Sequence, residues 1–449
     1  AKGGLRRMKK YDEYKDSGVA WIGDVPKHWE VGKLKHCSHI VLGKMLMTSP
    51  PKGSEGSYTL EKYLKSKNVG WLQLFLEEDN IDEMWFNQYE KSIYKLQEND
   101  IVMNEGGDIG KVSCWRGTDF DCYIQNSINK ITADYNRVDA GFLCYWLYNL
   151  SSLGYFWSIV SQISIAHLTK EKLSNSPVVL PPITEQVAIA TYLDTHCAKI
   201  DNLISIQQKR IALLQELKQS VITHAVTKGL NPNVEMKQSG VEWIGDVPKH
   251  WEVTKMNNNC STITDYVASG SFADLRKNVL YLDEPDYAML IRTADLSSTD
   301  RKLPPVYISK CSYEFLSNSN LFGGEVVLPN IGASIGNVYM VPKLYKHMSL
   351  APNAIMVKSY GNDRFLYYYF KSKPGVDSLM LIGMAAAQDK FNKTELRSLK
   401  VLVPPLEEQA AIASYLDHKC ATIDTSISNA QHQIDLLQEY KQSLITEVV

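Results

Sequence analysis

The segment SGVAWIGDVPKHWEV at residues 17–31 recurs as SGVEWIGDVPKHWEV at residues 239–253, with 14 of 15 positions identical. A second segment, residues 181–226, recurs at residues 404–449 with 28 of 46 positions identical. The two recurrences have almost the same offset, 222 and 223 residues, which excludes chance as their origin. The chain is therefore a tandem duplication in which each copy runs from an opening segment to a closing segment.

Between the opening and closing segments lie two largely dissimilar stretches, residues 32–180 and 254–403. Short echoes still pair them: LKSKNV with IRTADL, ENDIVMNEGGDIGKV with GGEVVLPNIGASIGNV, and FLCYWLY with FLYYYFK. Apolar positions dominate these echoes, as expected for the core strands of a common fold. We therefore expect the two stretches to share one fold while their polar loops differ.

Periodicity predicts an α+β fold for each stretch. The segments DIVM, KVSCW, EVVLP and NVYMV are short, β-branched and bounded by Gly or Asn, which is typical of strands and hairpins. The segments FLCYWLYNL and FLYYYFKS are longer, continuous and aromatic, which favours helices. The segments VVLPP and VLVPP are expected to be extended.

Helices are expected to open past each proline pair, at residues 184–185 and 407–408, and longer helices are expected over about 201–226 and 424–449. A helix of about 26 residues extends roughly 40 Å. Each long helix carries an apolar heptad stripe. The predicted seam consists of Ile204, Ile211, Leu214, Val221, Ile427, Ile434, Leu437 and Leu444. One such stripe alone is explained by packing within its own domain, but two copies favour the helices packing on each other as an antiparallel coiled coil.

An antiparallel helix pair would relate the two copies by a pseudo-two-fold axis. Duplex DNA has the same kind of symmetry, so two such domains are suited to reading two half-sites in inverted orientation. The helices would set a fixed, unread gap between the half-sites. Because the two domains differ in sequence, the whole site would be asymmetric.

Composition places the chain among ordinary globular proteins. Its 449 residues are 44% hydrophobic and 22% charged, and 48 Lys and Arg against 50 Asp and Glu give a net charge of −2. This balance excludes a basic protein that coats nucleic acid and an acidic solvating tail. The stretches 32–180 (15 basic, 17 acidic) and 254–403 (17 basic, 13 acidic) are also near neutral. A DNA-binding surface must therefore arise from local segregation of charge.

The sequence further predicts a reduced, cytoplasmic protein. No apolar run approaches the ~20 residues of a membrane span, and the N-terminus lacks the apolar core of a signal peptide. The eight cysteines include no Cys-x-x-Cys pair, which disfavours a disulfide framework or a structural zinc site. Residues 1–7, ahead of Met8, are expected to be a cloning remnant, with the native chain starting at Met8.

We find no catalytic or metal-binding constellation in the sequence. It lacks the Asn-Pro-Pro-Tyr type of motif of adenine methyltransferases and a glycine-rich cofactor loop after a predicted strand. The segment GGDIGKV at 106–112 would need Gly at 105 and Ser or Thr at 112 to be a Walker loop, and these positions are Glu105 and Val112. A turn with glycines at positive φ is the better interpretation. His28 and His250 have no second ligand nearby and are expected to pack beside the tryptophan that follows each.

This layout resembles the specificity (S) subunit of type I restriction-modification systems. The resemblance rests on the opening segments, on LPPITEQVAIATYLD (180–194) and VPPLEEQAAIASYLD (403–417), and on the long helices after them. It implies a non-catalytic subunit that binds a bipartite double-stranded DNA sequence, holds two adenine-methyltransferase (M) subunits and, through the complex, joins restriction (R) subunits. It also implies no cofactor in this chain: S-adenosylmethionine would belong to the M subunits, and ATP and Mg to the R subunits.

The resemblance divides the chain into five parts. The expected boundaries are an N-terminal extension (1–16), target recognition domain 1 (17–180), helical spacer 1 (181–230), target recognition domain 2 (231–403) and helical spacer 2 (404–449). Two alternatives from other classes stay open at this point. One is a protein-binding scaffold whose twin domains hold peptides. The other is a fused, single-chain restriction and methylation enzyme, against which the missing cofactor and catalytic motifs argue.

Reading DNA requires hydrogen-bonding side chains at base edges and cations at phosphates. The candidates in domain 1 are Lys65, Lys67, Asn68, Asn104, Lys111, Arg116, Gln125 and Asn126. The candidates in domain 2 are Arg292, Thr293, Asn330, Ser334, Asn337 and Asn353. A polar surface on the long helices also repeats, and its repetition suggests two equal partners docking there. Its residues are Gln215, Glu216, Lys218, Gln219 and Ser220, which recur as Gln438, Glu439, Lys441, Gln442 and Ser443.

Overall fold

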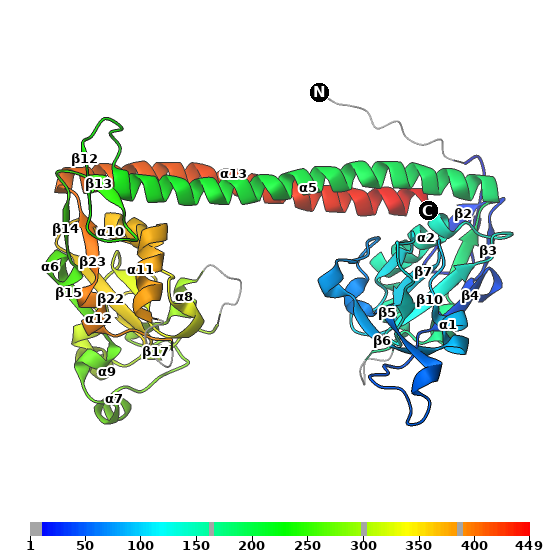
Figure 1. The fold of residues 1–449 in the computed structure, drawn as a ribbon, viewed down its shortest axis with the longest axis horizontal. Helices are drawn as coiled ribbons and strands as arrows, with labels where there is room; N and C mark the ends of the chain where they lie inside the picture. Colours follow the sequence, from blue (N-terminus) through cyan, green and yellow to red (C-terminus); the bar gives the residue numbers. More distant parts are fainter. Residues whose placement is uncertain (1–10, 161–165, 298–302, 384–388) are drawn as a thin grey trace. The chain divides into compact units, whose positions relative to one another are not determined.

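The computed structural model describes residues 11–160, 166–297, 303–383 and 389–449. The chain separates into unit 1, comprising Ala1–Ile206 with Gln433–Val449, and unit 2, comprising Gln207–His432. Each unit contains an α+β domain together with part of both long helices (Figure 1). The expected cloning remnant at residues 1–7 lies outside the described residues.

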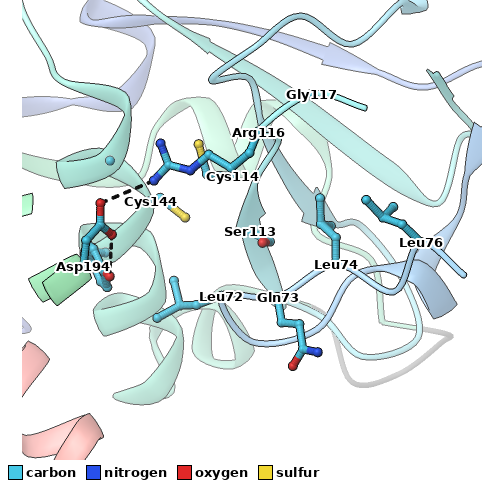
Figure 2. Close-up of a pocket in the computed structure, with 12 residues that line it drawn as sticks. Leu72, Gln73, Leu74, Leu76, Ser113, Cys114, Arg116, Gly117, Cys144 and Asp194 are labelled. Atoms are coloured by element: carbon cyan, nitrogen blue, oxygen red, sulfur yellow. Dashed lines mark hydrogen bonds and ion pairs between the residues drawn. The ribbon is translucent and has the colours of Figure 1, made fainter. Parts of the chain in front are cut away.

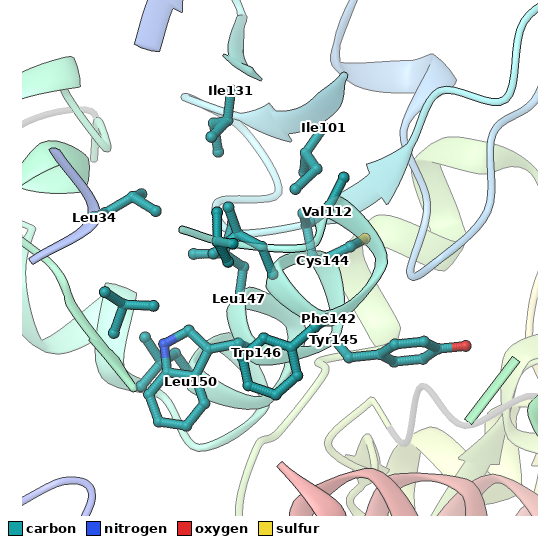
Figure 3. Packing of buried hydrophobic residues seen from close by; sticks show 14 of the residues in the cluster. Leu34, Ile101, Val112, Ile131, Phe142, Cys144, Tyr145, Trp146, Leu147 and Leu150 are labelled. Carbon is teal, nitrogen blue, oxygen red and sulfur yellow. The ribbon is translucent and has the colours of Figure 1, made fainter. Parts of the chain in front are cut away.

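The centre of unit 1 is a four-stranded antiparallel sheet in the order β4 (Ser38–Leu42), β10 (Ile128–Ala133), β7 (Ile101–Asn104) and β8 (Val112–Cys114). Helix α2 (Ala140–Ser152) starts at the N-cap Asp139, whose carboxylate accepts from the Phe142 backbone N–H. Phe142 and Trp146 of this helix are buried with Ile101 and Ile131 of the sheet, as Figure 3 shows. The aromatic segment is helical, and the strands lie where their β-branched residues predict.

A second, smaller sheet completes the domain of unit 1. Its strands are β6 (Asp82–Asn87), β5 (Tyr58–Leu64) and β9 (Tyr123–Ile124), with β5 and β9 parallel. The remaining helices of the domain are α1 (Gln88–Tyr94), α3 (Tyr155–Ile159) and α4 (Lys170–Ser174).

Unit 2 repeats this plan. Its central antiparallel sheet has the order β15 (Cys260–Asp265), β22 (Ala354–Ser359), β19 (Val326–Pro329) and β20 (Tyr339–Met340). Its second sheet has the order β17 (Tyr307–Ile308), β16 (Ala288–Ile291), β21 (Met348–Leu350) and β18 (Asn320–Leu321). Its domain helices are α6 (Met256–Asn259), α7 (Phe272–Asn278), α8 (Thr293–Leu296), α9 (Lys310–Phe315), α10 (Asp363–Lys371), α11 (Lys373–Gly383) and α12 (Lys393–Ser398).

The second sheet arises from the same chain stretches in both units. In chain order, most of the second sheet lies between the first two strands of the central sheet, β4 and β7 in unit 1 and β15 and β19 in unit 2. One further strand, β9 or β21, lies between the last two. That last strand pairs in parallel with β5 in unit 1 and with β16 in unit 2. The expectation of one shared fold with differing detail is therefore confirmed.

Each opening segment is paired with its closing segment. β3 (Glu30–Lys33) pairs with β11 (Pro177–Leu180), and β14 (Glu252–Lys255) pairs with β23 (Lys400–Val403). The opening segments also form small hairpins, β1 (Tyr14–Asp16) with β2 (Asp24–Pro26) and β12 (Met236–Gln238) with β13 (Asp246–Pro248). The two ends of each domain are thereby held together.

A glutamate that recurs in both copies also joins the two ends of each domain, through hydrogen bonds to the histidine and tryptophan of the opening segment. Glu185 accepts from Trp29 Nε1 at 3.3 Å and bonds His28 Nε2 at 2.9 Å. Glu408 accepts from Trp251 Nε1 at 2.8 Å and bonds the preceding histidine at 2.5 Å. A buried indole N–H needs such an acceptor, so the two segments depend on each other. The histidines therefore have the structural place expected beside their tryptophans.

The glutamine after each glutamate is also structural. Gln186 is fully buried, donates from Nε2 to Pro181 O at 2.7 Å and accepts from the Asp139 backbone N–H at 2.8 Å. Its counterpart Gln409 donates to Pro404 O at 2.8 Å and accepts from the Asn362 N–H at 2.9 Å. In both copies the glutamine therefore links the proline pair to the residue that caps the domain's aromatic helix.

The long helices are longer than the sequence predicts. α5 (Ile183–Lys228) and α13 (Leu406–Val448) are each one continuous helix, of 46 and 43 residues. The expected start near residues 201 and 424 is wrong, because neither segment contains a Gly or Pro to interrupt it. A 46-residue helix is about 69 Å long, so the expected 40 Å is also too short.

The two helices are joined by reciprocal ion pairs. Within unit 1, Lys441 Nζ of α13 binds Asp201 of α5 at 2.7 and 2.8 Å. Within unit 2, Lys218 Nζ of α5 binds Asp424 of α13 at 2.6 and 2.7 Å. The N-terminal half of each helix therefore pairs with the C-terminal half of the other, so the helices run antiparallel as predicted.

The predicted seam is at least half-buried along its whole length. Ile434 and Leu444 are buried, whereas the remaining seam residues are half-buried: Ile204, Ile211, Leu214, Val221, Ile427 and Leu437. The expectation that the whole repeated polar surface is free for docking needs correction at its two lysines. Because Lys218 and Lys441 are engaged with the partner helix of the same chain, neither is available as a free docking cation.

No helix within the described ranges is long and apolar enough to cross a membrane. All eight cysteines are unpaired thiols. Burial raises the pKa of Cys37 and of Cys114 to about 11, so both stay protonated at neutral pH. The reduced state of the thiols stays a prediction.

The Glu185 carboxylate should stabilise the fold in a pH-dependent way. Burial raises its pKa, but hydrogen bonds from Tyr11, His28 and Trp29 outweigh burial and hold the pKa below its ordinary 4.5. A lowered pKa means that the stabilisation is full above about pH 4.5 and is lost as the pH falls through the lowered value. Glu185→Gln should lower the free energy of unfolding by about 1 kcal/mol at neutral pH, less in acid.

Denaturant unfolding of the full chain from pH 7 downward measures this difference. Glu216→Gln, at an exposed position of α5, is the matched control and should change stability by less than ~0.5 kcal/mol. A loss for Glu185→Gln that is equal at neutral and acidic pH would contradict the assignment.

Candidate nucleic-acid interface

Two glycine-shaped turns occupy equivalent places in the central sheets. Turn 1 (residues 105–111) joins β7 to β8, and turn 2 (residues 330–338) joins β19 to β20. Four of the five glycines in these turns have positive φ: 72° at Gly107, 84° at Gly110, 67° at Gly332 and 90° at Gly336. A Cβ on Gly110 would also meet Ser151 Oγ at 2.2 Å, so glycine is required there. The predicted strand–turn–strand arrangement is confirmed.

A short segment ahead of α4 or α12 runs beside each turn. The Leu168 backbone N–H donates to Glu105 O at 2.7 Å, and the Phe391 N–H donates to Asn330 O at 3.1 Å. Bridges also join Gly106 to His167 and Ile331 to Lys390. Glu105 with His167 in unit 1 therefore takes the place of Asn330 with Lys390 in unit 2.

Sequence reasoning missed His167 and Lys390. The His167 Nδ1 lies 2.8 Å from Glu105 Oε2, and half of the His167 side chain is exposed. Lys390 is exposed and has no ion pair to any residue that the structure describes. They are the first residues of two echoing segments, HLTKEKL (167–173) and KFNKTEL (390–396), at an offset of 223 residues. This alignment is the signal that could have found them.

The predicted readers at residues 65–68 divide into two kinds. Lys65 binds Asp82, and Lys67 Nζ lies 3.6 Å from the same carboxylate. The hydrogen bond with Asp82 raises the pKa of Lys65, and in return it lowers the pKa of Asp82. Asn68 is fully buried, and its amide bonds the backbone of Lys65, Phe75 and Asn80. A base contact by Asn68 is therefore wrong, because its polar atoms hold the loop.

The candidates around turn 1 also differ in access. Asn104 is fully buried and donates to Ser66 O at 3.2 Å, which excludes a direct base contact in this conformation. Lys111 is half-buried and binds Asp108 at 2.5 Å. Arg116 donates to Asn99 Oδ1 at 3.2 Å. Of these, Lys111 stands on the turn itself.

Gln125 and Asn126 lie on the segment between β9 and β10. Gln125 Oε1 accepts from the Ser127 hydroxyl at 2.5 Å, and the Asn126 backbone N–H donates to Lys44 O at 2.8 Å. Both side chains are half-buried. The segment passes so close to Gly43 that a Cβ there would meet Gln125 O at 2.3 Å.

The candidates at residues 292–293 are held within their own helix. Arg292 donates from Nε and Nη2 to both oxygens of Asp295, at 2.9 and 2.7 Å, and from Nη2 to Pro304 O at 2.8 Å. Its fork is thus already used as a bidentate pair. In this conformation Arg292 is not free for the DNA contact predicted for it, because the i, i+3 aspartate occupies the same donors. Thr293 is the first residue of α8 and is half-buried.

The candidates in and near turn 2 remain accessible. Ser334, Asn337 and Asn353 are exposed, and Asn330 is half-buried. Asn353 has a φ of 71°, a conformation that asparagine tolerates better than most residues. The base contacts predicted for these four stay predictions.

An aspartate of each long helix, Asp194 in α5 and Asp417 in α13, contacts a tyrosine and an arginine of the adjoining domain. In unit 1, Tyr145 OH donates to Asp194 Oδ1 at 2.8 Å, and Arg116 Nη2 lies 3.6 Å from Asp194 Oδ2, beside a cavity of about 270 Å³ (Figure 2). In unit 2, Tyr368 OH and Arg364 Nε each donate to Asp417 Oδ1 at 2.7 Å. The two arginines come from different elements, so each domain supplies its own.

Among the described residues, no group of three or more His, Cys, Asp or Glu side chains could hold a metal ion. Turn 2 presents amide and hydroxyl groups with Lys390 beside it, whereas turn 1 presents Lys111 together with the carboxylates of Glu105 and Asp108. These groups form hydrogen bonds and ion pairs, which suits recognition of a polar, anionic ligand.

Known proteins share both the sequence pattern and the fold. Residues 26–215 and 268–434 match the family described as the type I restriction modification DNA specificity domain. The chain is 23% identical over 427 residues to the type I restriction enzyme MjaVIII specificity subunit of Methanocaldococcus jannaschii, covering 94% of this chain and 92% of that one. It is 20% identical over 368 residues to the type I restriction enzyme EcoKI specificity subunit of Escherichia coli, covering 80% and 75%.

A solved chain from a structural study of complex assembly and conformational transition of the type I R-M system has a similar fold. The TM-score is 0.68 at 14% sequence identity, and the match covers 94% of this chain and 98% of that one. At this identity the similarity establishes the fold alone.

Neighbouring positions on the 65–68 loop should respond differently to truncation. Asn68→Ala removes three buried hydrogen bonds to backbone groups and should lower the free energy of unfolding by about 2–3 kcal/mol. Lys67→Ala, one residue away and exposed, is the control and should cost less than ~0.5 kcal/mol. Chemical denaturation of the full chain measures both. Equal stabilities of the two variants would show that Asn68 does not hold the loop.

Proposed function

The chain belongs to the family of type I restriction-modification DNA specificity subunits, and from this premise we propose that it binds an asymmetric, bipartite DNA site with one half-site for each recognition domain. It positions two adenine-methyltransferase (M) subunits on that site and, through them, restriction (R) subunits. As a specificity subunit it is the DNA-selecting part of such a system and is not itself an enzyme.

One observation carries the proposal of two unlike half-sites: equivalent turns present unlike side chains. Lys111 of turn 1 corresponds to Asn337 of turn 2, and His167 beside turn 1 corresponds to Lys390. A base edge is read by the donors and acceptors that face it, so a shared fold that presents different groups would select different bases. A site with two identical half-sites would require neither difference.

Individual exposed lysines, rather than the net charge of either domain, support DNA as the ligand. Lys67 and Lys390 are exposed cations on the loops beside the turns, whereas both domains as wholes are near neutral. Such cations suit phosphate contacts, which supply affinity without sequence information. The exposed amide and hydroxyl groups of turn 2 would supply the selectivity.

The repeated helix surface supports two equal partners. Gln215 and Glu216 of α5 are exposed, as are their repeats Gln438 and Glu439 of α13. Leu213 of α5 and Leu436 of α13, also repeats of one another, are exposed as well, at 65% and 48%. Each copy of the polar surface therefore includes one exposed leucine at the equivalent position. Such a surface is suited to docking one M subunit on each copy.

The proposal assigns no cofactor to this chain. S-adenosylmethionine would be bound by the M subunits, and ATP and Mg by the R subunits. The side chains gathered at the turns suit hydrogen bonding to DNA, and they supply neither a nucleophile with its base nor a set of metal ligands.

Genome-wide mapping of modified adenines in the host, with and without this gene, tests the proposed function. We expect one asymmetric two-part motif to lose modification when the gene is deleted. Replacing residues 32–180 with the corresponding domain of a relative should change one half of the motif only. An unchanged modification pattern after deletion, or a change in both halves after the swap, would refute the proposal.

The proposed spacer role of α5 and α13 predicts a change in the unread gap. One heptad added to both helices lengthens them by ~10.5 Å, which is about 3 base pairs of duplex. We expect the gap to widen accordingly while both half-site sequences stay the same, as read by methylation of a duplex library in the reconstituted complex. Inserting the heptad in α5 alone is the control and should impair methylation. Altered half-sites with an unchanged gap would contradict the spacer role.

A further inference from the structure

Unit 2 contains a cavity of about 430 Å³ beside turn 2 that none of the features above explains. Three chain stretches line it: the end of β15 with the start of α7, turn 2 with the start of β22, and the segment that opens α12. Its lining includes Tyr266, Phe272, Asn330, Asn353 and Lys390. The volume lies within the roughly 300–1,000 Å³ of sites that hold small organic groups.

Three side chains in the lining of this cavity, Phe272, Asn353 and Lys390, are open to a ligand. Phe272 is 81% exposed, the highest value among the exposed large apolar residues that the structure describes, and Asn353 is exposed as well. Lys390 has no ion pair with any described residue. The two acidic groups of the lining are already engaged: Asp265 binds Lys393 at 2.7 Å, and Glu395 accepts from the Asn392 backbone N–H at 2.7 Å.

Asn330 adds an unsatisfied acceptor to the wall. Its Nδ2 donates to Phe391 O at 2.8 Å, and since a carbonyl oxygen only accepts, this bond fixes which way the amide points. The Oδ1 atom is buried and has no hydrogen-bond partner within the part of the chain that the structure describes. An unpaired buried acceptor is costly, and a donor group carried into the cavity would relieve it.

This combination of groups matches one chemical class. An exposed aromatic ring offers a stacking surface for a planar base, an amide oxygen accepts from an exocyclic amino group, and a lysine pairs with a phosphate. A peptide side chain would use the ring but would leave the lysine and the amide oxygen unmatched. An isolated anion would use the lysine alone.

We infer that this cavity receives one nucleobase displaced from the stack of the half-site that unit 2 reads; the inference rests on the proposed function. The base carries an exocyclic amino group that donates to Asn330 Oδ1, its face stacks on Phe272, and Lys390 pairs with a flanking phosphate. Displacing a base costs stacking and pairing, which the new stacking and ionic contacts offset.

The equivalent place in unit 1 has different chemistry. Glu105 and His167 stand where unit 2 has Asn330 and Lys390, and they are paired with each other at 2.8 Å. A carboxylate beside the turn repels phosphate, and it already uses the ring nitrogen of its neighbour. The inference therefore concerns unit 2 only, and the two half-sites should differ in whether a base is displaced.

Binding of mismatched duplexes by the reconstituted complex with M subunits tests this inference. Each base pair of the mapped half-site is mismatched in turn, and 2-aminopurine is placed at the same positions. Because displacing an already unpaired base costs less, a mismatch at one position other than the methylated adenine should tighten binding several-fold. At that position 2-aminopurine should brighten on binding.

Variants of unit 2 complete the test. Phe272→Ala should weaken binding about tenfold and abolish the brightening, whereas Phe272→Tyr should preserve both. Phe322→Ala, at a phenylalanine that is 68% exposed and lies outside the cavity lining, is the matched control and should behave like the parent chain. Lys390→Ala should weaken binding and reduce the slope of log affinity against log salt by about 1.

A complex that methylates both half-sites but shows no tightening and no brightening at any other position overturns this inference and leaves the proposed function intact. Equal effects of Phe272→Ala and Phe322→Ala overturn it in the same way. A complex that neither binds nor methylates any duplex of the library overturns the proposed function, and this inference with it.

Discussion

Each domain depends on a hydrogen bond between its two ends, from Trp29 to Glu185 in one copy and from Trp251 to Glu408 in the other. The bond joins the opening segment to the first turn of a long helix, beside an antiparallel strand pair that brings the same ends together. A buried indole N–H and a partly buried carboxylate are each costly without the other. This mutual requirement explains why the tryptophan of the opening segment and the glutamate of the closing segment both recur, whereas the residues between the two segments need only fill the space that the closure defines.

The enclosed domains show how much freedom that constraint leaves. Their central sheets keep one strand order, and in both units the chain leaves and re-enters the sheet at the same points to build a second sheet. The second sheet has three strands in unit 1 and four in unit 2, and even the arginine that meets the repeated aspartate is Arg116 in one domain and Arg364 in the other. The constant elements therefore carry the fold, and the changeable elements lie at the turns and loops where a ligand would be read.

The sequence was sufficient to predict the duplication, the strands of the central sheets, the aromatic helices and the antiparallel long helices, because each depends on local periodicity or on repetition. It was insufficient where a side chain's partner is remote or ambiguous. Asn68 looked like a surface amide, yet its partners are carbonyls on a loop several residues away that covers it. The sequence suggested that the Arg292 guanidinium is unpaired, yet Asp295, three residues later, forms an ion pair with it. His167 and Lys390 escaped notice because they become neighbours of the turns only through bridges across the fold.

The helix contacts explain why the duplication is useful. Asp201–Lys441 and Lys218–Asp424 are the same contact made twice with the roles of the helices exchanged, which is the pattern of isologous packing in a symmetric dimer. In a true homodimer every substitution appears in both halves, so both domains must read the same sequence. Joining the halves in one chain keeps the reciprocal contacts but lets each domain change by itself. An asymmetric target would therefore be accessible to the fused chain without disturbing the helix pair, because the proposed base-selecting residues and the residues that join the helices do not overlap.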